Sequence, residues 1–132
     1  MVGFDTNVLV RYLAQDDAAQ SRLANRAFGA LSKDEPGFIS LIVLCEMVWV
    51  LEDLYAMKKP ALIDILRTLL ESDELQIESK ALVWQVFGQF SGASLDFSDA
   101  LIAAVGSSAG CVHTLTFDKA AAKAAGFSLL KS

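Results

Sequence analysis

The sequence predicts an α/β protein in which helices cover both faces of a mostly parallel sheet. Short apolar segments that suit buried strands alternate with longer helical segments along the whole chain, and this alternation is typical of parallel sheets. The composition supports a packed core, because 54% of the 132 residues are apolar and only two are proline. No linker rich in proline, glycine or serine divides the chain. We therefore expect one compact domain over residues 1–132.

The first part of the chain predicts two strands and two helices. Residues 2–4 are apolar and precede a polar turn, which indicates a buried strand that leads into a helix over residues 8–13. A second helix is expected over residues 17–31. Pro36-Gly37 breaks the chain after it, and a second short strand follows at residues 38–40.

The middle of the chain predicts two helices and a third strand. Residues 41–55 suit a helix that is apolar nearly all round, so we expect it to be buried. Pro60 suits the first turn of the next helix, over residues 61–70. Residues 75–77 are the candidate strand that follows.

The last part of the chain predicts three helices and two strands. The helices are expected over residues 81–90, 96–110 and 118–125. Residues 112–116 alternate with β-branched side chains and indicate a strand, and residues 127–130 indicate the last one. Glycines suited to end these helices follow them: Gly92, Gly110 and Gly126.

Two acidic residues follow predicted strands. Asp5 ends the first strand, and Asp118 lies two residues beyond the strand at residues 112–116. In open parallel sheets, ligands bind outside the carboxyl ends of the strands. Each aspartate also suits a helix N-cap, so taken alone each fits a structural role equally well.

Glu46 is the most informative residue of the sequence. All positions from residue 41 to residue 51 except Glu46 itself are apolar. We therefore expect the Glu46 carboxylate to be partly desolvated. A buried charge is costly unless a cation, a metal or a proton compensates it. The structural alternative is a core salt bridge, with Arg11 as the candidate partner.

Asp96 and Asp99 open an apolar helix. Their spacing is that of a capping box, with Asp96 as the N-cap and Asp99 at the third helical position. A capping role therefore suits Asp96 better than a ligand role. Asp99 precedes Ala100 in the apolar stretch, which favours a role in a site.

Four carboxylates thus converge at strand ends or in apolar helices: Asp5, Glu46, Asp99 and Asp118. Carboxylates packed together raise one another's pKa, and a divalent cation relieves that repulsion. Oxygen ligands without paired His or Cys favour Mg²⁺ or Mn²⁺ over zinc, and the single His113 is expected to be structural. Two such ions about 3.5–4 Å apart can stabilise both the attacking and the leaving oxygen of a phosphodiester.

Four motifs surround these acids: Asp5-Thr6-Asn7-Val8-Leu9-Val10-Arg11-Tyr12-Leu13, Leu44-Cys45-Glu46-Met47-Val48-Trp49-Val50-Leu51, Phe97-Ser98-Asp99-Ala100-Leu101-Ile102-Ala103 and Thr116-Phe117-Asp118. In this order they resemble the acidic motifs of VapC-like PIN-domain toxins, over essentially the whole chain. Each motif alone is weak, whereas all four in register are specific.

The resemblance implies the PIN fold, a three-layer α/β/α sandwich with a mostly parallel central sheet. It also implies a Mg²⁺- or Mn²⁺-dependent endoribonuclease that is the toxin of a type II toxin–antitoxin pair. The implied metal ligands are the four acids named above. Asn7 and Thr116 match supporting polar positions of the family, and Asp96 either supports the site or only caps its helix.

The charge of the chain argues against a nucleic-acid substrate. The formal net charge is −5, which has the wrong sign for binding RNA. Subtracting the four proposed ligands from −5 leaves −1, so RNA remains compatible with the sequence. Arg11 is the best candidate for a phosphate contact, and Lys119 adjoins Asp118. Lys58-Lys59 is more typical of a solvated loop.

The expected partners are RNA, an antitoxin with an Arg- or Lys-bearing segment, and a second copy of the chain. A homodimer is predicted because PIN toxins pair and because two helices carry extra apolar area. The residues that supply this area are Leu62, Ile65, Leu69, Val83, Trp84 and Phe87.

A cytoplasmic location is expected, because the sequence shows no signal peptide and no membrane span. Cys45 and Cys111 are expected to be buried, inert thiols. Two other functions remain open. One is a PIN nuclease that processes RNA without an antitoxin. The other is a non-catalytic module whose acids bind structural Mg²⁺ or basic peptides.

Overall fold

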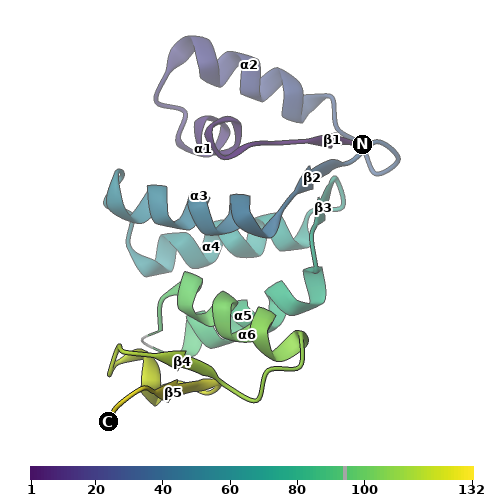
Figure 1. Ribbon diagram of the computed structural model, residues 1–132. Helices are drawn as coiled ribbons and strands as arrows, with labels where there is room; N and C mark the ends of the chain where they lie inside the picture. The colour runs from purple at the N-terminus through teal and green to yellow at the C-terminus, as the bar shows by residue number, and fades with distance from the viewer. Residues whose placement is uncertain (94) are drawn as a thin grey trace. The chain divides into compact units, whose positions relative to one another are not determined.

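The computed structural model describes residues 1–93 and 95–132, which form two compact units, Met1–Lys80 and Ala81–Ser132 (Figure 1). The strands pair in parallel in both units. The predicted α/β class with parallel strands is therefore confirmed. In the part of the chain that the structure describes, no helix has the length and apolar character needed to cross a membrane.

The first unit contains a three-stranded parallel sheet in the order β1-β2-β3 and four helices. Its elements are β1 (Val2–Gly3), α1 (Thr6–Ala14), α2 (Ala18–Gly29), β2 (Gly37–Ile39), α3 (Leu41–Asp53), α4 (Lys59–Glu71) and β3 (Leu75–Ile77). Polar side chains start three of the helices, because Asp5, Asp17 and Ser40 each accept a backbone N–H of the first turn. Pro60 lies in the first turn of α4, as predicted.

The register of the sheet sets Gly37 opposite Val2, and Gly37 has to be a glycine. A Cβ atom at this position would come within 2.4 Å of the Phe4 ring. Phe4 in turn stacks on Phe28 of α2, with ring centroids 4.4 Å apart. The first strand, the second strand and α2 are therefore held together around one aromatic side chain.

The helix α3 is buried on one face only, which corrects the expectation of a helix buried all round. Leu44, Met47, Val48 and Leu51 are buried. On the other face, Ile42 is 73% exposed and Trp49 is 58% exposed. An apolar pattern predicts a helix, but it does not say which of the apolar residues the core covers.

The second unit contains two helices, a short 3₁₀ helix and a two-stranded parallel sheet. Its elements are α5 (Lys80–Gly92), α6 (Phe97–Ser108), β4 (Thr114–Thr116), η1 (Ala121–Lys123) and β5 (Phe127–Leu129). The two helices meet through Phe90 and Phe97, whose rings pack edge to face at 5.7 Å. Val83, Val86 and Ala100 are also fully buried.

The helix predicted over residues 118–125 is only the three-residue η1. Alanine favours helix, but the chain has to return within a few residues to pair β5 with β4. Ala124 is already extended, and Gly126 makes the turn into β5 with a φ of +90°. The backbone N–H of Thr114 then donates to the Gly126 carbonyl. The closing of the sheet thus outweighs alanine's helix propensity.

Several other expectations about burial are wrong. Cys111 is exposed, and Cys45 is half-buried, where burial and the neighbouring Glu46 raise the pKa of its thiol. Three residues of the predicted dimer surface are buried, namely Leu62, Leu69 and Val83, whereas Trp84 is 38% exposed. Apolar spacing on a helix does not distinguish a core face from an interface.

Candidate metal centre

Asp5 stands where β1 ends and α1 begins, in the first unit. It is the N-cap of α1, and its Oδ1 accepts the backbone N–H of Val8 at 3.0 Å. Its other carboxylate oxygen has no hydrogen-bond partner among the described residues. The capping role and the ligand role are therefore compatible, because each uses a different oxygen.

Glu46 is exposed on α3, so the predicted desolvation is wrong. Its Oε1 accepts a hydrogen bond from the hydroxyl of Thr6 at 2.7 Å. No ion pair to Glu46 occurs in the described part of the chain, and Arg11 pairs with Asp16 instead. The alternative of a core salt bridge between Glu46 and Arg11 is therefore wrong as well.

Thr6 contacts a candidate site residue, and the sequence analysis did not include it among the site residues. It follows Asp5 directly, and its hydroxyl reaches an acid 40 positions further along the chain. The contact ties the start of α1 to the exposed face of α3 and fixes one oxygen of Glu46. A hydroxyl residue directly after the first acid is a signal that the sequence did contain.

In the second unit, Asp99 lies in the first turn of α6 and is half-buried. Burial raises the pKa of its carboxyl above the ordinary value, and the nearby charges of Asp96 and Asp118 raise it further. Asp96 is the N-cap residue of α6, but its side chain makes no capping hydrogen bond. The predicted capping box is therefore not formed.

Asp118 lies in a tight turn just after β4 ends at Thr116. Its backbone N–H donates to the Thr116 hydroxyl at 3.0 Å, and its Oδ1 accepts the backbone N–H groups of Ala120 and Ala121. Its second oxygen has no partner in the described residues. Thr116 thus holds the turn that contains Asp118, and its supporting role in a site stays a prediction.

The acids of each unit are by themselves too few or too far apart for a complete metal site. Within Met1–Lys80, and within the described residues of Ala81–Ser132, no three His, Cys, Asp or Glu side chains could hold a metal ion. The donor chemistry nevertheless suits a hard cation. The candidate donors are all carboxylate oxygens, and none of the acids is ion-paired in the described part of the chain.

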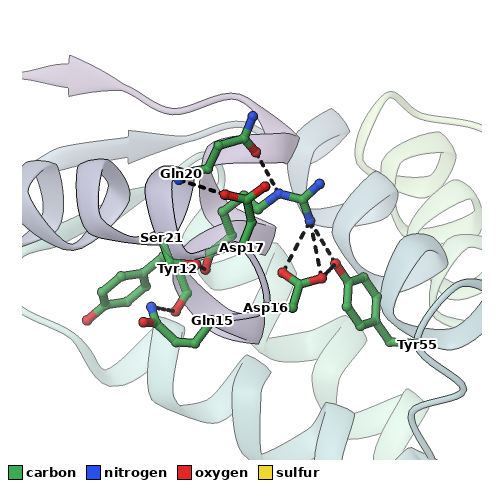
Figure 2. A network of polar contacts seen from close by, with 8 residues as sticks. Tyr12, Gln15, Asp16, Asp17, Gln20, Ser21 and Tyr55 are labelled. Atoms are coloured by element: carbon green, nitrogen blue, oxygen red, sulfur yellow. Dashed lines mark hydrogen bonds and ion pairs between the residues drawn. The ribbon is translucent and has the colours of Figure 1, made fainter.

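Arg11, in the last turn of α1, belongs to a polar network with Asp16, Gln20 and Tyr55, which Figure 2 labels. Its Nη1 donates to the Tyr55 hydroxyl at 2.8 Å and lies 3.3 Å from Asp16 Oδ1, and its Nε donates to Gln20 Oε1 at 2.7 Å. The Tyr55 hydroxyl donates to Asp16 at 2.6 Å, which lowers the pKa of Asp16 and raises that of Tyr55. Burial opposes the charge of Arg11, but Asp16 and Tyr55 hold its pKa above the ordinary value.

The comparison with protein families found one that matches almost the whole chain. The PIN domain matches residues 3–127, which include all of the candidate acids. This chain belongs to the PIN-domain family. Neither the comparison with curated proteins nor the one with solved structures produced a match. The PIN domain is generally a nuclease fold, and its nucleases generally use divalent metals.

Asn7, predicted to support the site, and Arg11, predicted to bind substrate, both lie on α1 after Asp5. Asn7 is exposed on the first turn of α1, and its side-chain amide has no partner among the described residues. Arg11 lies one turn further along the helix. Both line a cavity of about 330 Å³ that Asp5 also lines. Lys119, the basic residue next to Asp118, is exposed.

Proposed function

We propose that this PIN domain is a Mg²⁺- or Mn²⁺-dependent endoribonuclease and the toxin of a toxin–antitoxin pair. The proposed metal ligands are Asp5, Glu46, Asp99 and Asp118. One observation carries the proposal: three of these acids have one oxygen fixed by a protein donor and a second oxygen with no partner in the described residues. Oxygens held in this way are ready to bind a cation.

The fourth acid, Asp99, supports the proposal by a different route. It accepts no hydrogen bond from the described residues and lies half-buried near two other carboxylates. Its ionised form is therefore costly without a cation. A divalent metal would remove this cost and would find the hard oxygen ligands that Mg²⁺ and Mn²⁺ prefer.

The metal, when bound, would supply an activated water and would stabilise the charge that develops on the phosphodiester. The chain's own residues have simpler tasks. Thr6 orients Glu46 through its hydroxyl, and Thr116 holds the turn of Asp118. Such residues behind a metal ligand fix its direction, so their loss weakens metal binding or activity.

The test is the induction of the wild type and of the Asp5→Asn variant, followed by mapping of RNA ends across the transcriptome. Asp17→Asn is the matched control, because Asp17 caps α2 by the same type of bond, at 2.9 Å to Gln20. Asparagine caps a helix about as well as aspartate. We expect new RNA ends with the wild type and the control but none with Asp5→Asn. Equal cleavage by Asp5→Asn would refute the ligand assignment.

The antitoxin is proposed to inhibit by placing an Arg or Lys side chain on the acids, because charge-assisted bonds to carboxylates are strong. Saturating antitoxin should then lower nuclease activity, and excess metal should partly restore it. A short reading frame next to the gene that encodes a DNA-binding protein with a flexible tail would support the toxin role. Its absence would favour RNA processing without an antitoxin.

A homodimer is also proposed. Trp84 and the half-buried Phe87 still offer apolar area on α5, with their rings packed edge to face at 5.6 Å. Light scattering at tens of micromolar should give twice the mass of the chain.

The remaining alternative function is a non-catalytic module. It predicts that the wild type binds metal but cleaves no RNA.

A further inference from the structure

A cavity of about 330 Å³ in the first unit has a mixed lining. Its apolar part comes from Val8 of α1 and from Leu23, Ala24 and Ala27 of α2. Its polar part includes Asp5, the first proposed metal ligand. This volume falls in the range of small-ligand pockets, which combine an apolar wall with a few polar groups.

Three polar groups of the lining have hydrogen-bonding capacity left. Among the described residues, the Gln20 side chain uses only its Oε1, for the bond from Arg11 Nε, and its Nε2 has no partner. Arg11 donates from Nε and Nη1, which leaves Nη2 without a partner in the described residues. The amide of Asn7 is unpaired in the same part of the chain. The cavity therefore offers both donors and an acceptor to a ligand.

The charge of the cavity indicates which group it would accept. Asp16 lies 3.3 Å from Arg11 Nη1, so the positive charge of Arg11 is already compensated. The lining also includes Asp5, which is negative. A phosphate would find little net attraction here. A neutral group with a hydrogen-bonding edge would find donors without repulsion.

Leu23 gives the cavity an exposed apolar wall. Its side chain is 61% exposed on α2, although it is a large aliphatic residue. Arg22, Asn25 and Arg26 around it are all exposed. A flat apolar ligand in the cavity would cover this side chain.

We propose that this cavity binds one unpaired nucleobase of the RNA. The base would lie next to the phosphodiester that is cleaved at the proposed metal site, to which Asp5 belongs. A nucleobase has apolar faces and a neutral hydrogen-bonding edge, and proteins read single-stranded RNA by contacting both. An aliphatic peptide side chain would leave the three polar groups unused, and a basic one would meet Arg11. The inference rests on the proposed nuclease function, and it gives Arg11 a base contact in place of the predicted phosphate contact.

The test is an NMR titration of the full chain in EDTA with each of the four ribonucleosides and with inorganic phosphate. We expect at least one nucleoside to shift the backbone amides of Leu23, Ala24 and Ala27 saturably, and phosphate to shift none. Ala27→Leu should fill the cavity and weaken this binding by about tenfold or more, which is a modest loss of binding free energy. Ala27 is exposed, so the variant should fold.

Ala18→Leu is the matched control, because Ala18 is exposed on the same helix and does not line the cavity. It should bind nucleosides as the wild type does. Three results would overturn the inference: no saturable shift with any nucleoside, equal binding by Ala27→Leu, or displacement of the nucleoside by acetyl-leucine amide at equal concentration. The last result would favour a peptide ligand.

Failure of this inference differs from failure of the proposed function, because the titration needs neither metal nor turnover. If nucleosides bind but the protein cuts no RNA, the nuclease proposal fails and the base site stands. If the protein cuts RNA and Ala27→Leu keeps the same base preference at the cleaved position, the base site fails and the nuclease stands.

Discussion

The acids of the two units are held in different ways. In the first unit, Asp5 and Glu46 are exposed, and each has one oxygen fixed by a hydrogen bond from the protein. In the second unit, Asp99 is half-buried, has no such bond among the described residues, and is repelled by Asp96 and Asp118. In the first unit, the ionised acids destabilise the folded state little. In the second unit, ionised Asp99 destabilises the folded state until a cation or a proton binds.

This difference separates two properties that a metal site needs. Hydrogen bonds from Thr6 and Val8 give direction to the acids of the first unit. Burial and the like charges of its neighbours disfavour the ionised form of Asp99, which a bound cation would stabilise. Variants of the two regions should therefore have similar effects on cleavage but different effects on the metal-free protein.

The largest expected effect is on cleavage. Glu46→Gln and Asp99→Asn each remove one negative charge and keep the side-chain shape, so both should lower the rate of RNA cleavage by orders of magnitude. Both should also reduce the rise in melting temperature on addition of Mg²⁺ or Mn²⁺, because stabilisation by a ligand grows with its affinity.

Asp53→Asn is a suitable control for this pair, because Asp53 is an exposed acid at the end of the same helix as Glu46. It should cleave RNA at the wild-type rate. If Glu46→Gln cleaved as fast as this control, Glu46 would not be a ligand, and only the second unit's acids would remain candidates.

The next effect concerns the hydroxyls that hold the acids. Thr6→Val removes the donor to Glu46, and Thr116→Val removes the acceptor in the Asp118 turn. Loss of a residue that orients a ligand typically lowers metal affinity or activity by about 10–100-fold. Thr6→Ser keeps a hydroxyl and should restore most of the activity. If metal titrations gave the same affinity for Thr6→Val, Thr6→Ser and the wild type, the Thr6–Glu46 hydrogen bond would contribute to folding and not to metal binding.

A smaller effect is expected in the stability of the metal-free protein as a function of pH. The folded-state pKa of Asp99 lies above its ordinary value of 3.8. Below pH 3.8 the carboxyl is protonated in both states and costs nothing. As the pH rises from 3.8 through the raised folded-state value, ionisation disfavours the folded state, and the loss is complete above that value.

Asp99→Asn removes this group, so in EDTA it should match the wild type at low pH and be more stable above the transition. Chemical denaturation at several pH values measures both. If Asp99→Asn and the wild type had the same pH profile of stability, ionised Asp99 would not destabilise the folded protein.

Much of this fold follows from local sequence patterns. The short apolar runs and the cap residues located most strands and helices within a few residues, and Asp5 and Asp118 follow β1 and β4 as predicted. Local patterns succeed here because an N-cap or a strand end depends on neighbours in sequence.

The contacts that define the candidate site depend on distant neighbours. The exposed position of Glu46 depends on which face of α3 the core covers, and an apolar pattern leaves that open. The Thr6–Glu46 bond spans 40 positions and the Arg11–Tyr55 bond spans 44. Sequence spacing gives no information about such pairs. The roles of the four acids as ligands and the single-domain organisation stay predictions.

The smallest expected effect separates the capping role of an acid from its ligand role. Asp5 caps the nine-residue α1, so Asp5→Ala should cost about 1 kcal/mol of folding free energy in EDTA. Asp118 holds only the turn before a three-residue 3₁₀ helix, so Asp118→Ala should cost less. Asn at either position keeps an acceptor oxygen and should change stability by a few tenths of a kcal/mol at most.

Urea denaturation in EDTA measures these four variants on one scale, and RNA cleavage measures them on another. Asp5→Asn should then be stable but inactive, which a purely structural cap cannot explain. Asp5→Asn that is both stable and active would leave Asp5 as a cap alone. If Asp118→Ala lost more stability than Asp5→Ala, the turn after β4 would be more important for folding than the start of α1. The sheet closure at Thr114 and Gly126 would then depend on it.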